Sequence, residues 1–453
     1  MLRSSAWQEC ICLNTPMRIF HRNILLAVTF SALFLSVRTF GTVITGIDNA
    51  KHHAATENSE RVPVIRFRSA HSPQIALEAT HVTEKKPTMN VVVEESPILR
   101  VGPERKLKLP SDAAKIAKDG DIIEIDAGIY LNDYSQWPQN NLTIRGVGGG
   151  FAHLKSTGLI ANGKAIWITQ GNKIQIENVE FSGAAVENTN GAGIRHEGGD
   201  LKLHKTFFHD NEFSILSGTL PEADIEITSS RFWFQKRPTR HSHGLYIGKA
   251  RRFVLKGSHV KGTDKGHQVK SRALENYILY NRIEEVRERY SSRLIDLSNC
   301  GFSIIMGNDL YQAPQTDNNN LIGYGPEGCN GRTEKQMKLF VINNTIVNEA
   351  RQGTIVRSFH GGNVTVANNL LFGAGSFLVG EGIELSNFRE DLHQRERESY
   401  DAPQDSNAID NAAQQLPAAG VSLTPTAEFQ PPLGYRERPK DAKLDAGSRE
   451  NIP

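Results

Sequence analysis

Short runs in which apolar residues alternate with other residues recur along the chain from residue 142 onward. Successive runs begin 32, 27, 24, 28, 24, 26, 36 and 25 residues apart, about 28 on average. A repeat of roughly 20 to 50 residues indicates a solenoid of stacked structural units. The runs begin at Leu142, Ile174, Leu201, Ile225, Phe253, Tyr277, Ser303, Leu339 and Val364.

A second short strand precedes several of these runs, at 244–248, 268–271, 294–297 and 354–357. Helical repeats are excluded, because no ten-residue stretch of this region keeps a 3.6-residue periodicity. Strands of this length, stacked at about 4.8 Å per coil, predict an all-β fold. We expect a parallel β-helix (solenoid) whose alternate side chains fill the interior.

Helix and corner signals fit this fold. Residues 109–130 predict a short helix with Ser111 or Asp112 as its N-cap, followed by a Gly-Asp turn and a strand. Such a helix would cover the open end of the solenoid core. Asparagine tolerates a left-handed corner and can stack as an amide ladder. Candidates for this role are Asn178, Asn281, Asn308, Asn343 and Asn368.

The segment 109–130, with the Asn-Leu-Thr-Ile-Arg-Gly-Val-Gly stretch at 141–148, resembles the opening of right-handed parallel β-helix proteins of the pectin-lyase-like superfamily. The resemblance implies a right-handed parallel β-helix with a short N-terminal capping helix over residues 105–385. Residues 439–448 are similar to the closing segment of many bacterial members. We therefore expect 386–453 to be a polar tail that packs partly along the helix.

The N-terminal region carries a targeting signal. Within 17–39 a basic start precedes an apolar run of about 14 residues, shorter than the roughly 20 that span a bilayer. We interpret 1–39 as a signal peptide or an uncleaved N-terminal anchor, with a buried helix as the alternative, and 40–104 as a polar leader or linker. The predicted location is periplasmic or secreted, with membrane contact only through this segment. Export would permit a Cys300–Cys329 disulfide.

Charge is unevenly distributed, although 52 Lys and Arg against 50 Asp and Glu give a formal charge of only +2. Residues 231–293 contain 16 Lys and Arg against 5 Asp and Glu, a net charge of +11. Stacked coils would gather this block into a basic patch that attracts an anionic polymer. The alternative is ordinary solvated charge on a long β-rod. No nucleic-acid-reading motif is present, so an acidic polysaccharide is the predicted partner and nucleic acid is not.

The predicted strand register places the candidate site on one face. If Leu245, Val269 and Ile295 point inward, Tyr246, Lys270 and Asp296 form an outward column. Positions before and after the same strands add further side chains within two coil spacings, on the order of 10 Å. These further residues are His243, His267, Arg272 and Arg293, with Arg357 extending the column after an irregular coil.

These residue types suit β-elimination of a uronate, in which a cation neutralises the C6 carboxylate, a base removes the C5 proton and a donor protonates the leaving oxygen. Crowding by like charges favours a neutral Lys270 that could act as the base. Arg272 or Arg293 would hold the carboxylate, and Tyr246 or His243 would supply the proton. Lyases of the resembled superfamily use a Lys and an Arg in related roles, for which Lys270 and Arg272 are the match.

The remaining candidates, His267, Arg293, Asp296 and Arg357, are predicted to bind substrate. Each candidate also has a structural interpretation. Lys270 can be simply solvated, Asp296 can be an ion-pair partner, and His267 can be a corner residue.

Other enzyme classes fit less well. Residues 241–248 resemble a segment of polygalacturonase-type hydrolases, but the carboxylate motifs of those enzymes are absent. The Asp-Pro-His-Asp motif of mannuronan epimerases is also missing. We expect no cofactor and no transition metal, with Asp309 and the turn 317–320 as the one candidate Ca²⁺ site. The leading hypothesis is a polysaccharide lyase. The alternatives are a non-catalytic polysaccharide-binding or adhesion β-helix and a uronate C5-epimerase, and the sequence does not bear on oligomeric state.

Overall fold

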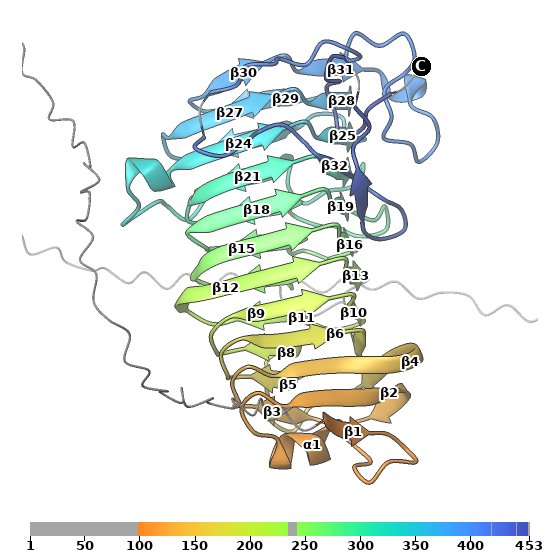
Figure 1. Ribbon diagram of the computed structural model, residues 1–453. Coiled ribbons are helices and arrows are strands. Elements are labelled where there is room, and N and C mark those ends of the chain that lie inside the picture. The colour runs from red at the N-terminus through yellow and green to blue at the C-terminus, as the bar shows by residue number, and fades with distance from the viewer. Residues whose placement is uncertain (1–97, 234–241, 418, 441, 452–453) are drawn as a thin grey trace, which may run out of the picture. The chain divides into compact units, whose positions relative to one another are not determined.

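The recurring strands wind into the predicted right-handed parallel β-helix (Figure 1). It has three faces, whereas the sequence indicated at least two strands per coil. The computed structural model describes residues 98–233, 242–417, 419–440 and 442–451. The predicted signal segment and nearly all of the predicted leader lie outside this part of the chain. Within the described ranges no helix is long and apolar enough to cross a membrane.

Two of the faces share one 21-stranded sheet, and the third face is a separate 10-stranded sheet. Strands β2 and β4 are long enough to bend from the first face onto the second. The first face consists of β2 (Ile122–Leu131), β4 (Thr143–Lys155), β6 (Ile174–Glu177), β9 (Leu201–His204), β12 (Leu220–Thr228), β15 (Ala250–Lys256), β18 (Glu275–Leu279), β21 (Phe302–Met306), β24 (Lys338–Ile342), β27 (Asn363–Ala367) and β30 (Ile383–Leu385). The second face continues with β7 (Val179–Ser182), β10 (Phe207–His209), β13 (Arg231–Trp233), β16 (His259–Lys261), β19 (Arg282–Glu284), β22 (Asp309–Gln312), β25 (Thr345–Asn348), β28 (Leu370–Gly373) and β31 (Phe388–Glu390).

The third face carries the predicted site residues. Each of its strands pairs in parallel with the corresponding strand of the next coil, so one coil follows another along the sheet. Its members are β3 (Ser135–Trp137), β5 (Ala165–Thr169), β8 (Ala192–His196), β11 (Phe213–Ser217), β14 (Leu245–Ile247), β17 (Val269–Ser271), β20 (Ile295–Leu297), β23 (Asn320–Tyr324), β26 (Thr354–Ser358) and β29 (Ser376–Val379).

Alternating side chains fill the interior between the faces. Leu245, Val269 and Ile295 are fully buried, as the register prediction requires. On the second face the rings of Phe181 and Phe208 stack at 4.9 Å between centroids, and Phe232 continues the stack at 5.2 Å from Phe208. Parallel strands in register place like residues directly above one another, which makes such columns possible.

The asparagine corners combine two adjacent positions. Asn343 and Asn368 adopt the left-handed conformation, with φ of 50° and 56°. The residue after each, Asn344 and Asn369, joins the buried amide ladder, as do Asn281 and Asn308 in earlier coils, with Nδ2 to Oδ1 distances of 2.9 to 3.0 Å. The ladder prediction is therefore confirmed for Asn281 and Asn308. For Asn343 and Asn368 the predicted left-handed conformation is confirmed, but the asparagine that follows each of them makes the hydrogen bond of the ladder.

A short helix closes the N-terminal end of the coil stack. Helix α1 (Pro110–Ile116) buries Pro110 and Ala113 and lies beside β1 (Ile98–Val101) and β3 (Figure 1). The predicted N-cap is wrong. The helix begins at Pro110 with Leu109 as N-cap, and Asp112 accepts the Leu109 N–H at 3.1 Å from inside the first turn. The strands begin at Ile98 and the last coil ends at Glu390, slightly beyond both predicted boundaries of 105 and 385.

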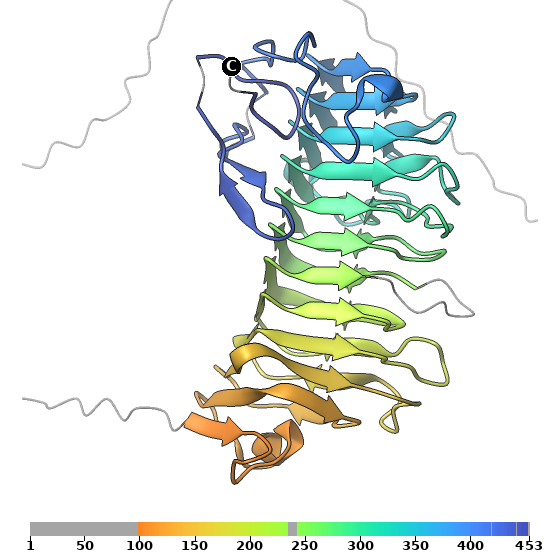
Figure 2. The same ribbon diagram turned by 90° about the vertical axis from the view of Figure 1, so that its right-hand side faces the viewer.

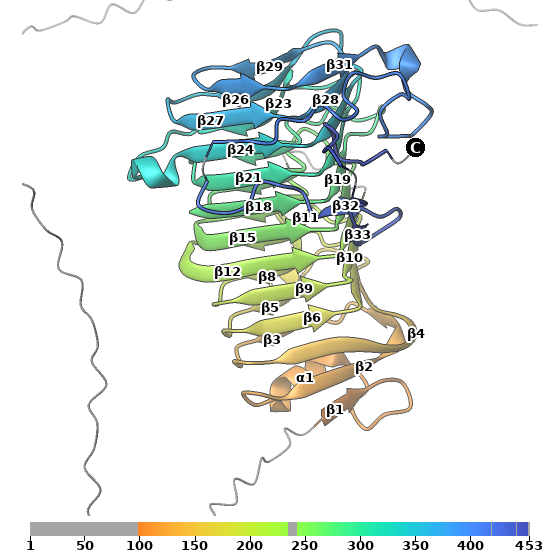
Figure 3. The same cartoon turned by 45° about the horizontal axis from the view of Figure 1, so that its top comes forward.

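The C-terminal tail returns along the second face and its corner with the first (Figures 2 and 3). After η2 (Leu392–Gln394), Tyr400 and Ala408 pack on Val347 and Phe372, and the hairpin of β32 (Ala427–Phe429) and β33 (Tyr435–Glu437) follows. The tail therefore contacts the coils over much of its length.

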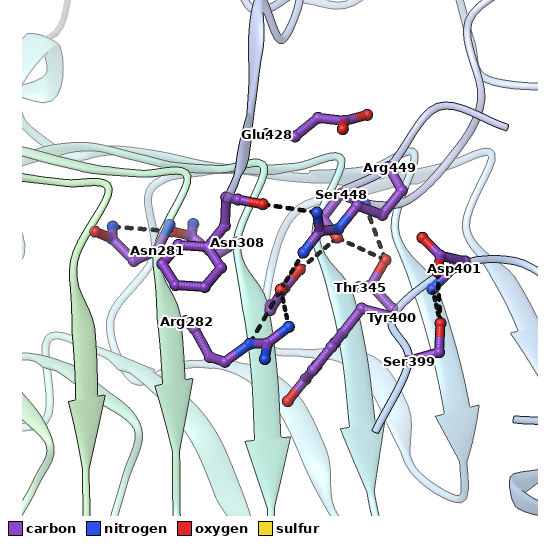
Figure 4. Close-up of polar contacts among 12 residues, drawn as sticks. Asn281, Arg282, Asn308, Thr345, Ser399, Tyr400, Asp401, Glu428, Ser448 and Arg449 are labelled. Carbon is purple, nitrogen blue, oxygen red and sulfur yellow. Dashed lines mark hydrogen bonds and ion pairs between the residues drawn. The ribbon is translucent and has the colours of Figure 1, made fainter. Parts of the chain in front are cut away.

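A buried ionic network locks the end of this tail to the coils (Figure 4). Asp309 is fully buried and receives hydrogen bonds from Arg282 at 2.9 Å, Arg449 at 2.6 Å and Ser448 at 2.7 Å. Ser448 also contacts Thr345. The carboxylate of Asp309, named above as a candidate Ca²⁺ ligand together with the turn 317–320, is thus compensated by two guanidinium groups.

Candidate functional site

The predicted column exists on the outer side of the third face. Tyr246 pairs with Lys270 and Lys270 with Asp296 across neighbouring strands, so these three side chains share one row. The row continues through Gly323 to Arg357. The register prediction is therefore confirmed, including the extension to Arg357.

A loop covers the middle of this column, which the sequence did not predict. The loop 325–337 leaves β23 and includes η1 (Glu334–Gln336). The Cys300–Cys329 disulfide ties it to the turn after β20, and Arg332 donates to the carbonyl oxygens of Asn299 at 3.1 Å and Arg272 at 3.0 Å. Beneath the loop only 9% of the Lys270 side chain is exposed. The column faces outward from the sheet but is sheltered from solvent.

Glu327 brings a carboxylate from this loop into the site. It accepts a hydrogen bond from Lys270 Nζ at 2.7 Å and is held by Arg272 through Nε at 3.1 Å and Nη2 at 2.7 Å. Burial raises the pKa of the Glu327 carboxyl, but the hydrogen bonds from Lys270 and Arg272 outweigh it and hold the pKa below its ordinary value. Glu327 is therefore ionised and lies between the two cations.

Arg272 also joins Tyr246 to this group. Its Nη1 donates a hydrogen bond to the Tyr246 hydroxyl, and the guanidinium carbon lies 5.0 Å from the centre of the tyrosine ring. Arginine combines stacking with bidentate carboxylate binding because its guanidinium is planar and always charged. Tyr246, Arg272 and Lys270 thus form one hydrogen-bonded group around the Glu327 carboxylate.

Asp296 is the buried anion at the centre of the column. Its side chain is 1% exposed and accepts a hydrogen bond from Arg293 Nη1 at 2.7 Å and another from Ser298 Oγ. Lys270 Nζ lies 3.6 Å from its other oxygen, and His267 Nε2 lies 3.5 Å away. Two basic side chains and a hydroxyl compensate the buried carboxylate, as burial of a charge requires.

Glycine at position 323 makes the Arg293 contact possible. A Cβ atom at this position would lie 2.8 Å from Cδ and Nε of Arg293, closer than side chains tolerate. Arg293 therefore crosses the column where the side chain is missing. Beyond it the guanidinium groups of Arg293 and Arg357 flank the ring of Phe359, at 5.4 and 5.1 Å from its centre.

The two histidines stack at the corner that precedes the column. The rings of His243 and His267 lie 4.9 Å apart, and each Nδ1 accepts a backbone N–H, from His267 at 2.9 Å and Arg293 at 3.1 Å. Burial, followed by the nearby His267 and Lys270 charges, holds the pKa of His243 well below its ordinary range. His243 is therefore a neutral imidazole with its proton on Nε2, able to donate a hydrogen bond.

Lys270 differs most from the predicted role. Its amine contacts two carboxylates, Asp296 and Glu327, which are the contacts of a charged ammonium donor. While Glu327 stays in place, the Lys270 amine donates a hydrogen bond to this carboxylate, which is not the arrangement expected of the predicted base. Lys270 lies in the outward row with Tyr246 and so does not point into the core.

The prediction of one basic patch at 231–293 is wrong. Among the described residues, the cations of this block lie on all three faces, and many of them pair with acids, most of which come from outside the block. Neighbouring coils supply these acids because stacking places opposite charges side by side. Outside the third face the pairs are Arg251 with Asp224, Arg252 with Glu275, Lys261 with Glu284, Arg282 with Asp309 and Arg287 with Glu349.

The surface has one hollow next to the column and another on a different face. One of about 740 Å³ adjoins Arg357 and is lined by the turn 317–320, by 351–354 and by 374–376. A cleft of about 700 Å³ lies on the second face, between the coils and the tail segment 395–400, with Lys261, Arg282 and Glu284 among its lining residues. The second cleft is lined by equal numbers of cationic and anionic side chains.

Glu327 is the functional candidate that sequence reasoning missed. It lies 57 residues from Lys270 in the chain, and no register rule places a loop residue over a strand. One signal was present: the interval of 36 residues between the runs at Ser303 and Leu339 exceeds the mean of about 28. The additional residues of this coil form the loop that covers the column.

No family model and no curated protein matches the chain. Among solved structures, a GH136 lacto-N-biosidase from Eubacterium ramulus aligns at 12% identity and a TM-score of 0.41, over 64% of this chain and 67% of that one. ORF18 of Geobacillus virus E2 aligns at 15% identity and 0.38, over 61% and 56%. Pectin methylesterase from carrot aligns at 13% and 0.29, over 64% and 82%. None of these similarities carries an activity over to this chain.

Proposed function

We propose that the protein acts on an acidic, uronate-containing polysaccharide at the third face, as a lyase. The observation that carries this proposal is the Glu327 carboxylate clamped by Lys270 and Arg272 beside the Tyr246 hydroxyl. A uronate C6 carboxylate has the same charge and shape as that of Glu327. When the loop carboxylate leaves, the substrate carboxylate takes its place between the same two cations.

The chemistry follows from these positions. Lys270 and Arg272 neutralise the substrate carboxylate, which makes the neighbouring C5 proton more acidic. The Tyr246 oxygen receives a hydrogen bond from Arg272, and as a phenolate paired with that guanidinium it takes the C5 proton. The C5–H electrons form the C4–C5 double bond, the C4–O bond breaks with its electron pair on the leaving oxygen, and the Tyr246 hydroxyl so formed returns the proton to that oxygen. His243 acts as a neutral hydrogen-bond donor, and Asp296 holds Lys270 and Arg293 in position.

The test is incubation of the purified chain with alginate, polygalacturonate and hyaluronan, with the ultraviolet absorbance of unsaturated uronates as readout. We expect activity on one polymer that disappears in Tyr246→Phe and Lys270→Ala. The exposed Lys249, on the turn after β14, provides the matched control Lys249→Ala. Activity that survives in Tyr246→Phe would contradict the assignment of the proton transfer.

A non-catalytic polysaccharide-binding protein is the second candidate. The observation that favours it is the polar hollow beside Arg357, whose lining includes Asn318, Asn319 and Asn320. Amides and a guanidinium suit the hydroxyl and carboxylate groups of a sugar chain. Binding without a new double bond and without deuterium incorporation at C5 would support this candidate. Deuterium incorporation without cleavage would instead identify an epimerase.

The proposed location is outside the cytoplasm. The Cys300–Cys329 disulfide supports this proposal, because such bonds persist in oxidising compartments. Fractionation of the native host cells, with the chain detected by antibody, would test it. Recovery in the cytoplasmic fraction alone would contradict it.

A further inference from the structure

A cluster of two histidines and a glutamate lies on the second face, apart from the third-face column. His153 lies on β4, Glu180 on β7 and His209 on β10, three consecutive strands of the stack. His153 and Glu180 are directly paired in register, and His209 lies two residues beyond the partner of Glu180. Neither the proposed lyase chemistry nor the packing of the core uses these three side chains.

The three side chains converge on a single point. Glu180 Oε1 lies 2.9 Å from His209 Nε2 and 3.4 Å from His153 Nε2, and all three ligand atoms lie within 4.8 Å of one another. Tetrahedral zinc with bonds of 2.0 to 2.1 Å places its ligand atoms about 3.4 Å apart. Small side-chain movements from the observed positions would therefore complete a coordination triangle.

Surrounding groups orient the ligands as they do in metal sites. Asp210 Oδ2 lies 2.7 Å from His209 Nδ1, on the side of the ring away from Glu180. A carboxylate on the second nitrogen fixes the ring orientation and increases the basicity of a ligating histidine. The rings of His153 and Phe207 flank that of His209, at 5.7 and 4.8 Å between centroids.

The cluster is reachable from solvent. The side chains of His153, Glu180 and His209 are 15%, 16% and 24% exposed. Ser182 Oγ lies 2.7 Å from His153 Nε2, where it can hydrogen-bond a water on the ion after a metal displaces it. Three protein ligands with an open fourth position are typical of a zinc site that binds water or substrate.

We propose that His153, Glu180 and His209 bind one divalent transition-metal ion, with zinc as the favoured ion. The imidazole and carboxylate donors suit zinc and cobalt and do not suit calcium, which prefers oxygen ligands alone. The ion would cross-link three successive coils of the stack. The site is independent of the proposed polysaccharide chemistry and stands if that proposal fails.

Metal titration of the full chain tests this site. The protein is prepared without a polyhistidine tag, treated with chelator, and titrated with Zn²⁺ by calorimetry and with Co²⁺ by visible absorption. We expect one Zn²⁺ ion bound in wild type that is lost in the double variant His153→Ala/His209→Ala. Asp210→Asn should weaken binding by about 10-fold to 100-fold, as loss of an orienting carboxylate does.

His259 provides the matched control. It lies on the same face and contacts a single carboxylate, Glu284 at 2.8 Å. His259→Ala should leave Zn²⁺ binding unchanged, and circular dichroism checks that each variant is folded. The proposal is overturned if wild type binds no Zn²⁺, or if the double variant binds as tightly as wild type. In the first case the cluster is only a hydrogen-bonded network, and in the second the ion sits on other histidines.

Discussion

Neutralising Glu327 should strengthen the binding of acidic oligosaccharides. In the structure the Glu327 carboxylate occupies the position between Lys270 and Arg272 that a substrate carboxylate would take. Glu327→Gln keeps the size of the side chain and the disulfide that anchors the loop but removes the competing charge. The substrate then no longer has to displace an ion pair.

The size of the effect follows from the contacts. Hydrogen bonds to charged groups contribute about 1.5 to 3 kcal/mol when buried, and exposed ion pairs contribute about 0.2 to 1 kcal/mol. The Glu327 side chain is 41% exposed but faces two cations, so about 1 to 2 kcal/mol opposes binding in wild type. At 1.4 kcal/mol per factor of ten, Kd should fall by about 5-fold to 30-fold.

Calorimetric titration of wild type and Glu327→Gln with the same uronate oligomers measures this change. Glu334→Gln on the same loop is the control, because Glu334 is exposed and lies outside the clamp. Binding that is unchanged or weaker in Glu327→Gln would refute the idea that this carboxylate competes with substrate. If binding tightens but cleavage is lost, Glu327 is itself part of the catalytic machinery.

Three further predictions concern stability, measured as the free energy of unfolding in urea. Asp309→Asn should cost about 3 to 5 kcal/mol, since it leaves buried guanidinium groups unpaired; a loss below about 1 kcal/mol would contradict this. Burial raises the pKa of Glu284, but the hydrogen bond from His259 and nearby cations lower it to about 2. Ionised Glu284 should therefore contribute roughly 3 kcal/mol to the free energy of unfolding above about pH 4.5, and this contribution should be lost as the pH falls to 2. In Glu284→Gln the free energy of unfolding should not show this loss between pH 4.5 and 2. Cys329→Ser should cost about 3 to 4 kcal/mol, given the 29-residue separation of the linked cysteines, and added reductant should then have no further effect.

Local sequence patterns were sufficient to predict that the chain forms stacked β-coils. The alternation around Leu245, Val269 and Ile295 is a period-2 signal, and a single error in register would have reversed every side chain. The same alternation placed Tyr246 and Lys270 in one outward row, because parallel strands in equivalent coils repeat the same phase. The predicted N-cap residue was wrong because Pro110 occupies the first helical position and Asp112 lies within the first turn, so the helix begins earlier than expected.

The chemical state of the site required contacts that no local pattern encodes. The sequence by itself determined a parallel β-solenoid and a row of polar side chains along it, since both follow from short-range periodicity. Only the tertiary structure decided that Glu327 neutralises Lys270 and Arg272 and that acids from other coils compensate the basic block. The physical reason is that electrostatic interactions depend on distance in space, whereas residues 57 positions apart become neighbours only when the coils stack and the disulfide fixes the loop.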